Sequence, residues 1–122
     1  MSDLNVVDSS AWLEYLKGSE RAELYSSAIE DTANLIVPLI SIYEVFKRFL
    51  RDRNETDALE AIGTMHHGRI VEMDLSLILE AAKLRLPMAD SLIYATAQRY
   101  QATLWTQDED FSDLPGVRYF TK

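Results

Sequence analysis

Short apolar runs alternate with amphipathic stretches along the sequence, and this alternation limits the fold more than any other feature. Runs typical of buried strands lie at residues 5–8, 35–37, 70–73, 103–105 and 117–120. Between them, apolar residues recur every three to four positions, the spacing of one helix face. Strands that alternate with helices at intervals of roughly 30 residues are joined by crossovers and lie parallel. We therefore predict a single α/β domain over residues 1–122, a three-layer α/β/α sandwich with a mostly parallel sheet of four to five strands.

The amino-acid composition excludes several kinds of site. The 122 residues include no cysteine, which rules out disulfides, thiolate zinc sites and a cysteine nucleophile. The two histidines, His66 and His67, are adjacent, and neighbours on a helix point about 100° apart, so a solvated helix end is the better interpretation than a zinc site. No stretch approaches the ~18 consecutive apolar residues of a membrane helix. We expect a cytoplasmic protein with no membrane contact.

The charge balance is strongly acidic. There are 20 acidic and 12 basic residues, for a formal net charge of -8. Taken alone, this charge argues against long-range attraction to nucleic acid and favours a small-molecule enzyme, a signalling domain or a protein with a basic partner. A net charge does not say where the charges lie, so the function class is argued from the positions of the acidic residues.

Four acids are expected at one edge of the predicted sheet. In parallel α/β sheets, ligands bind at the carboxyl ends of the strands, where the N-termini of helices also point. Asp8 ends the first strand, and Asp108 comes two residues after Thr106, where the fourth strand ends. Glu44 lies about one and a half turns into the helix after the second strand, and Asp90 lies in the first turn of its helix. Each acid alone is most simply a helix cap, but together they predict a carboxylate cluster.

A carboxylate cluster needs a cation. Like charges within a few ångströms raise one another's pKa and destabilise the fold unless a cation lies among them. Mg²⁺ and Mn²⁺ prefer carboxylate oxygens and keep several water ligands. The sequence therefore predicts a Mg²⁺ or Mn²⁺ site at this edge of the sheet.

Four motifs, taken in order, are similar to those of one known family. They are VVDSSAWLEYL at residues 6–16, SIYEVFKR at 41–48, MADSLIYATA at 88–97 and WTQDEDF at 105–111. With this order and spacing, the sequence resembles the PIN-domain family, and within it the ribonuclease toxins of VapBC toxin-antitoxin systems. The resemblance covers essentially the whole chain. Two departures are a short connection at residues 82–90 and a last motif that offers three acids, Asp108, Glu109 and Asp110.

The resemblance implies a metal-dependent endoribonuclease that leaves a 5′-phosphate and a 3′-hydroxyl. The catalytic residues that it implies are Asp8, Glu44, Asp90 and Asp108, of which Asp8, Asp90 and Asp108 would hold one or two Mg²⁺ or Mn²⁺ ions. Glu44 would position the attacking water or complete the coordination shell. The family pattern favours Asp108 over Asp110, which would then support the site from outside. The hydroxyls of Ser9 and Thr106 would bond a carboxylate or the scissile phosphate, or else serve as ordinary cap or turn contacts.

Positive charge is concentrated on the helix that carries Glu44. Lys47, Arg48 and Arg51, with Arg53 close by, form either a phosphate-binding track beside the acids or a solvated helix face. Arg85 and Arg99 are further candidates that the sequence does not place. By their periodicity, most of these aromatic residues are expected in the core, and some could instead form an exposed groove: Trp12, Tyr25, Tyr43, Phe46 and Phe49.

The resemblance also implies protein partners. These are a second copy of the chain, forming a homodimer, and a VapB-like antitoxin that places a basic side chain among the acids. Two other functions stay open from the residues. One is a PIN-like binding module without activity, and the other is a receiver-type signalling domain with Asp74 as phosphoacceptor. The receiver interpretation is weakened because no lysine occurs between Lys83 and Lys122.

Overall fold

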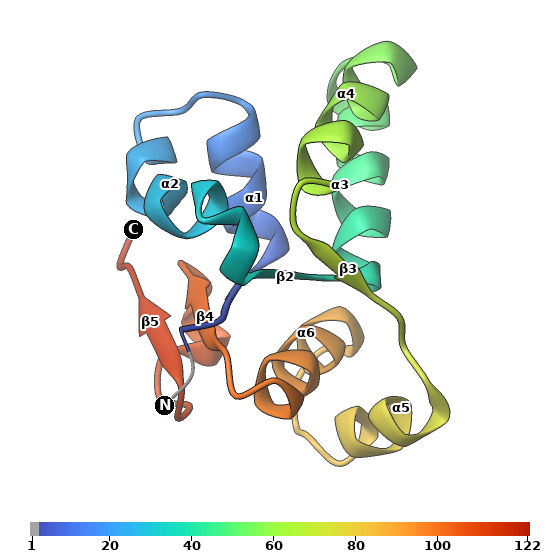
Figure 1. Ribbon diagram of the computed structural model, residues 1–122, viewed down its shortest axis with the longest axis vertical. Coiled ribbons are helices and arrows are strands. Elements are labelled where there is room, and N and C mark those ends of the chain that lie inside the picture. Colours follow the sequence, from blue (N-terminus) through green and yellow to red (C-terminus); the bar gives the residue numbers. More distant parts are fainter. Residues whose placement is uncertain (1–2) are drawn as a thin grey trace.

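The structure, a computed structural model that describes residues 3–122, consists of a central sheet between two layers of helices (Figure 1). Five parallel strands form the sheet in the order β3-β2-β1-β4-β5. The strands are β1 (Asn5–Val7), β2 (Leu35–Pro38), β3 (Arg69–Val71), β4 (Thr103–Thr106) and β5 (Val117–Tyr119). The helices are α1 (Ser9–Leu16), α2 (Ala22–Glu30), α3 (Leu39–Asp52), α4 (Glu55–Met65), α5 (Leu75–Ala82) and α6 (Met88–Arg99), with the 3-10 turns η1 (Thr32–Asn34) and η2 (Glu109–Phe111). The predicted α/β/α sandwich is confirmed, and its sheet is parallel throughout.

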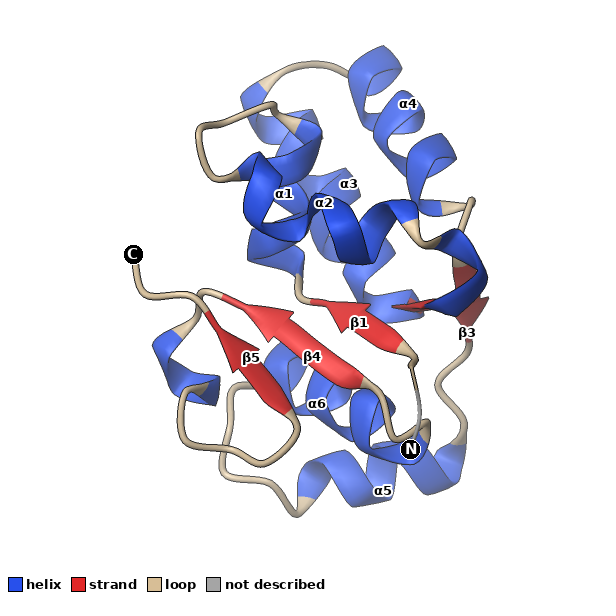
Figure 2. Cartoon of the chain, turned by 60° about the vertical axis from the view of Figure 1, so that its left-hand side comes forward, coloured by secondary structure: helices blue, strands red, loops and turns tan. Residues whose placement is uncertain are grey.

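The helices divide between the two faces of the sheet. Helices α1 to α4 cover one face, and α6 covers the other with α5 packed against it (Figures 1 and 2). The strands serve both faces because successive side chains point to opposite sides. Val7 and Leu35 pack with the first group of helices, whereas the neighbouring Val6 and Ile36 pack with Ile93 of α6. Burying each such side chain stabilises the fold by about 1.5–3 kcal/mol.

The strand boundaries differ from the sequence expectation by one or two residues, most at the third strand. The third strand begins at Arg69 and ends at Val71, where residues 70–73 were predicted. The chain leaves the sheet early because Asp74 is the N-cap of α5, and its carboxylate accepts the backbone N–H of Leu77. Within residues 3–122, no helix is long and apolar enough to cross a membrane.

Candidate active site

The four acids predicted from the sequence lie at the carboxyl edge of the sheet. Asp8 directly follows β1, and Asp108 lies two residues beyond β4, the strand that pairs with β1. Glu44 projects from α3, which follows β2, and Asp90 lies in the first turn of α6. All four line a single cleft of about 490 Å³. The parallel topology thus brings together acids that are far apart in the sequence.

Asp8 is a buried helix cap with a perturbed carboxyl group. It is 3% exposed, and its Oδ1 accepts the backbone N–H of Ala11 at 2.9 Å and the hydroxyl of Ser10 at 3.0 Å. Its Oδ2 accepts the hydroxyl of Thr106. Burial raises the pKa of Asp8 from 3.8 to about 6, although these hydrogen bonds lower it, and the carboxylate of Asp108 raises it further. The hydrogen bonds to Asp8 therefore do not offset the effect of burial on its ionised form.

Asp90 carries the larger perturbation. Burial raises its pKa from 3.8 to about 7, and the nearby carboxylates add to the effect, with Asp108 first and then Asp8 and Glu44. Within residues 3–122, its side chain accepts no hydrogen bond. Asp90, Asp108 and Asp110 each place one carboxylate oxygen within 4.8 Å of the others. Asp110 was expected to support the site from outside, but its carboxylate lies within the cluster itself.

Two hydroxyl groups hold the acids in place. The hydroxyl of Ser9 donates to Oε1 of Glu44 at 2.6 Å, which joins the start of α1 to α3. The hydroxyl of Thr106 donates to Asp8 and accepts the backbone N–H of Asp108 at 2.9 Å. Both hydroxyls contact carboxylates or their backbone, which favours the site interpretation over that of an isolated cap or turn.

The donor set of this cluster fits a hard divalent cation. All the ligand atoms that the cluster offers are carboxylate oxygens, which Mg²⁺ and Mn²⁺ prefer. Imidazole is absent from the cleft lining among the described residues, and His66 and His67 are exposed at the end of α4 as the sequence predicted. Burial, followed by repulsion from neighbouring carboxylates, raises the pKa values of Asp8 and Asp90. A divalent ion bound among the acids would supply compensating positive charge.

A basic wall borders the acids. Lys47, Arg48 and Arg51 line the same cleft from the exposed side of α3. Asp52 orders part of this wall, because its carboxylate accepts Nε of Arg48 and Nε of Arg51, each at 2.9 Å. It also accepts Nζ of Lys17 at 2.8 Å, and these three cations hold the pKa of Asp52 far below its ordinary value. The cleft therefore presents acids and fixed cations side by side.

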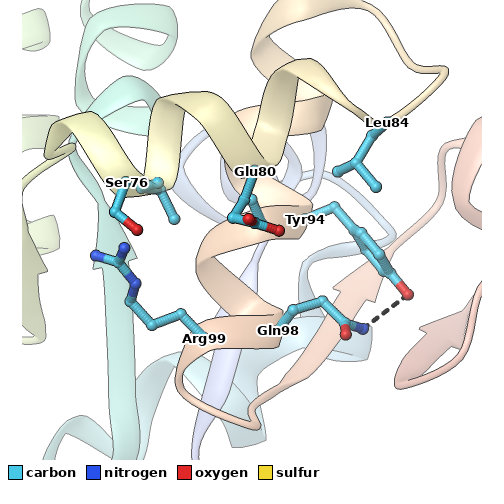
Figure 3. A pocket seen from close by; sticks show the side chains of 8 residues that line it. Ser76, Glu80, Leu84, Tyr94, Gln98 and Arg99 are labelled. Atoms are coloured by element: carbon cyan, nitrogen blue, oxygen red, sulfur yellow. Dashed lines mark hydrogen bonds between the residues drawn. The ribbon is translucent and has the colours of Figure 1, made fainter.

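Other cations lie away from this cleft. Arg53 rests against the ring of Phe49 and lines a separate pocket beside α4. Arg99 lines a cavity of about 500 Å³ between α5 and α6 (Figure 3), where both its terminal nitrogens donate to Asp74. In the same cavity, Gln98 donates to the hydroxyl of Tyr94, as the dashed line in Figure 3 shows. Arg99 thus lines a different cavity from Lys47, Arg48 and Arg51 and does not extend the basic wall.

One cleft residue was placed in the core by sequence reasoning. Tyr43 is 59% exposed and lines the cleft, and the ammonium group of Lys47 lies 5.5 Å from the centre of its ring. The sequence signal was its position four residues before Lys47, which puts both on one helix face. Trp12, Tyr25 and Phe49 are buried as predicted. Ser10, which bonds Asp8 and lines the cleft, had also not been singled out.

The third strand argues against the receiver interpretation. Receiver domains place their third strand in the middle of the sheet, in the order 2-1-3-4-5. Here β3 is an edge strand, and Asp74 beyond it is bound by Arg99 and does not line the acid cleft. The strand order and the place of Asp74 therefore argue against the alternative of a receiver domain with Asp74 as phosphoacceptor.

Comparison with known proteins shows the same fold in bacterial toxins. A segment of 43 residues is 46% identical to Ribonuclease VapC4 of Mycobacterium tuberculosis, covering 35% of this chain and 33%, about a third, of that protein's length. A toxin-antitoxin complex from Klebsiella pneumoniae contains a chain with a TM-score of 0.75 and 24% identity, over 93% of this chain and 95% of the other. The Mycobacterium tuberculosis toxin VapC20, described as cleaving the Sarcin-Ricin loop, has a TM-score of 0.75 and 15% identity, over 91% of this chain and 95% of its own.

The family itself is determined by the match along the sequence. The sequence model described as "PIN domain" matches residues 6–117, which include Asp8, Glu44, Asp90 and Asp108. The five-stranded parallel sheet with its acid-lined edge agrees with the structural similarity. Because the match spans nearly all of the 122 residues, the chain belongs to the PIN domain family.

Proposed function

We propose that this chain is a Mg²⁺- or Mn²⁺-dependent endoribonuclease that acts in the cytoplasm as the toxin of a type II toxin-antitoxin pair. One observation carries the proposal: the oxygens of Asp90, Asp108 and Asp110 lie within 4.8 Å of one another at a cleft that also has a basic wall. Carboxylates suit the metal, and fixed cations suit the phosphates of a nucleic acid. Similarity to a protein named as a ribonuclease and to a toxin described as cleaving the Sarcin-Ricin loop supports RNA as the substrate.

Four of the acidic residues would bind the metal ion. Asp90, Asp108 and Asp110 would hold a divalent ion, with Asp8 behind them as a further ligand whose two oxygens are already oriented by hydrogen bonds. When bound, such an ion lowers the pKa of water and stabilises negative charge on phosphate oxygens. The involvement of Asp110 extends the metal set of Asp8, Asp90 and Asp108 expected from the family pattern.

Glu44 would orient the attacking water. Its Oε1 accepts the hydroxyl of Ser9 at 2.6 Å, which fixes the carboxylate. Among residues 3–122 no group bonds Oε2, so this oxygen would accept a proton from water in the cleft. A carboxylate within hydrogen-bond reach of the nucleophile is the usual arrangement for general-base assistance. Ser9 and Thr106 are therefore assigned as positioning residues for Glu44 and Asp8.

The basic wall would bind the RNA backbone. Because Lys47, Arg48 and Arg51 line the cleft beside the acids, they would neutralise phosphates that flank the scissile bond. This local positive charge explains how a chain with a net charge of -8 would bind RNA. Asp52 would keep Arg48 and Arg51 in fixed positions, which lowers the entropy cost of ordering them on substrate binding.

Replacing both arginines with glutamine tests this role. We expect the Arg48→Gln, Arg51→Gln protein to bind RNA more weakly, with the slope of log K against log salt reduced by roughly 0.7 for each phosphate that is no longer neutralised. Fluorescence anisotropy across a salt series measures this slope. Arg85→Gln is the matched control, because Arg85 is exposed between α5 and α6 and does not line the cleft. Equal slopes for the double variant and the wild type would contradict the assignment.

Two protein partners are expected, an antitoxin that reaches the acid cleft and a second copy of the chain that binds elsewhere. The structurally similar chain from Klebsiella pneumoniae comes from a toxin-antitoxin complex, which supports a VapB-like antitoxin as a partner here. A basic side chain of that antitoxin would inhibit by offsetting carboxylate repulsion and competing with the metal. A second copy of the chain would cover Leu75, Ile78 and Leu79, which are exposed on one face of α5. Co-purification with a small basic protein and a dimeric sedimentation mass are the expected results.

The alternative is a PIN-like binding module without activity. It would have the same fold and would bind a partner through the same cleft, but it would not use the metal for hydrolysis. The presence of all four acids at one cleft favours the nuclease. Sequencing of RNA ends that carry a 5′-phosphate, after induction of the protein in cells, separates the two. New ends that are absent with the Asp90→Asn protein support the nuclease, and an unchanged set of ends favours the binding module.

A further inference from the structure

A second cleft, of about 530 Å³, adjoins the acid-lined cleft. The two clefts share Ser10 and Asp108, so they meet at a residue of the proposed metal site. The remaining lining residues of the second cleft are Gln107, Glu109, Tyr119, Thr121 and Lys122. A polymer bound at the acids can therefore continue into this second cleft.

The register of the sheet explains why Tyr119 lies there. Strand β5 runs parallel to β4, and Tyr119 pairs with Thr106, whose hydroxyl bonds Asp8. Tyr119 is the last residue of β5, just as Thr106 is the last residue of β4. Both strands therefore end at the same edge of the sheet, with an aromatic side chain next to the carboxylates.

The wall of the second cleft is held by a network of hydrogen bonds. Arg21 donates from Nε to Oε1 of Gln107 at 2.6 Å and from Nη2 to the carbonyls of Phe120 and Thr121 at 3.1 and 3.3 Å. Gln107 is 5% exposed, and its Nε2 donates to Glu14 at 2.8 Å. The segment after β5 is thus tied to α1, α2 and the end of β4. A fixed wall of this kind binds a ligand without first having to be ordered.

The chemistry of the second cleft suits a nucleoside. Tyr119 is half-buried, and within residues 3–122 its hydroxyl has no hydrogen-bond partner. A tyrosine ring offers a stacking surface for a base, and single-stranded RNA is recognised in this way. The carboxylates of Asp108 and Glu109 and the hydroxyl of Ser10 accept hydrogen bonds of the kind that base amino groups donate. The two carboxylates would repel a bare phosphate, which leaves Lys122 as the cation for the backbone.

We propose that the second cleft binds a nucleoside of single-stranded RNA next to the scissile phosphate, with Tyr119 as the stacking residue and Lys122 as a backbone contact. This inference rests on the proposed ribonuclease function. It adds a direction to that function, because the RNA strand runs from the basic wall on α3, across the acids, to the end of β5. The substrate is thereby restricted to RNA whose strand is unpaired at the cleavage site.

Binding of a labelled single-stranded oligoribonucleotide tests the proposal without requiring cleavage. The measurement uses fluorescence anisotropy in Mg²⁺ with the Asp90→Asn protein as the reference, so that the RNA stays intact. Adding Tyr119→Leu should weaken binding by about tenfold, the typical effect of removing one base–aromatic stack, whereas Tyr119→Phe should preserve it. Adding Lys122→Gln, at an exposed position that does not affect folding, should lower the salt slope by roughly 0.7.

The outcomes distinguish this inference from the proposed function. Unchanged binding with Tyr119→Leu, or an unchanged salt slope with Lys122→Gln, would overturn the nucleoside site even where the wild-type chain cleaves RNA. Weakened binding with Tyr119→Leu but not Tyr119→Phe supports the site, whatever the wild-type activity. Equal melting temperatures for the Tyr119→Leu and Tyr119→Phe proteins show that the loss of binding is not a loss of folding. Absence of cleavage by the wild-type chain would overturn the nuclease assignment alone.

Discussion

Replacing Asp90 with asparagine is expected to lower kcat for RNA cleavage by about a hundredfold or more. Loss of a residue that only supports a metal ligand typically costs 10–100-fold, and loss of a ligand itself should cost at least as much. Asp90 is a sharper target than Asp8, which also caps α1 through the backbone N–H of Ala11. The side chain of Asp90 accepts no hydrogen bond from residues 3–122, so its replacement removes a charge and a ligand without removing a structural contact. Cleavage of labelled RNA under single-turnover conditions measures the effect.

Asp113→Asn provides the matched control for this prediction. Asp113 is exposed, lies beyond η2 and lines neither of the two clefts that meet at Asp108. It undergoes the same chemical change, so its activity should stay within twofold of the wild type, about the effect of an ordinary surface substitution. Equal activity of the Asp90→Asn and Asp113→Asn proteins would remove Asp90 from the catalytic site.

Divalent metal is expected to raise the melting temperature of the wild-type protein at pH 8 and to have little effect on the Asp90→Asn protein. A ligand that binds only the folded state at a hundred times its Kd stabilises it by about 2.7 kcal/mol. For a domain of this size that corresponds to roughly 10 °C. The shift should be smaller at pH 5, because protons compete with the metal for the carboxylates. Differential scanning fluorimetry with Mg²⁺ or Mn²⁺ at both pH values measures it.

Without metal, the same substitution is expected to stabilise the protein at pH 8. A carboxyl group whose pKa is raised by folding favours the folded state while it is protonated. Its contribution is fully present below the ordinary pKa of 3.8 and is lost as the pH rises through the folded pKa, about 6 for Asp8 and about 7 for Asp90. At pH 8 the wild-type protein therefore carries the cost of an ionised Asp90, which asparagine removes. The difference between the two proteins should be smaller at pH 5, and it should disappear only as the pH falls below 3.8, where Asp90 is protonated in both the folded and the unfolded state.

Two results would contradict this account of the acid cluster. One is the absence of any metal-induced shift in the wild-type protein at millimolar Mg²⁺ and Mn²⁺. The other is a metal-free Asp90→Asn protein that is less stable than the wild type at pH 8. The first would mean that the acids do not form a metal site, and the second that Asp90 has a structural role.

The sequence predicted the fold well because each strand and helix carries its own local signal. Val6 and Val7 give the apolar run of β1, and Asp8 directly after them gives both the helix cap and the first acid. The convergence of the acids followed from the parallel topology, since all strand ends of one direction meet at one edge. Sequence reasoning succeeded where local pattern and topology point to the same place.

Features that depend on pairing between distant residues were not predictable in this way. Tyr43 belongs to the apolar stripe of α3 by its periodicity, and that stripe alone does not reveal that Tyr43 is 59% exposed in the cleft. The contact between Arg21 and Gln107 joins residues 86 positions apart. The place of Tyr119 opposite Thr106 depends on the register between β4 and β5, which short strands do not specify. Gln107 and Tyr119, the residues of the last two features, line the second cleft.

The central claim is that this acid cluster binds a divalent metal and hydrolyses RNA. RNA cleavage by the purified wild-type chain, with the new ends identified chemically, tests it most directly. The predicted result is no cleavage in EDTA, restoration by Mg²⁺ or Mn²⁺, and products with a 5′-phosphate and a 3′-hydroxyl, because water attacks the phosphorus atom. Full cleavage in EDTA, or products that end in a 2′,3′-cyclic phosphate, would contradict it.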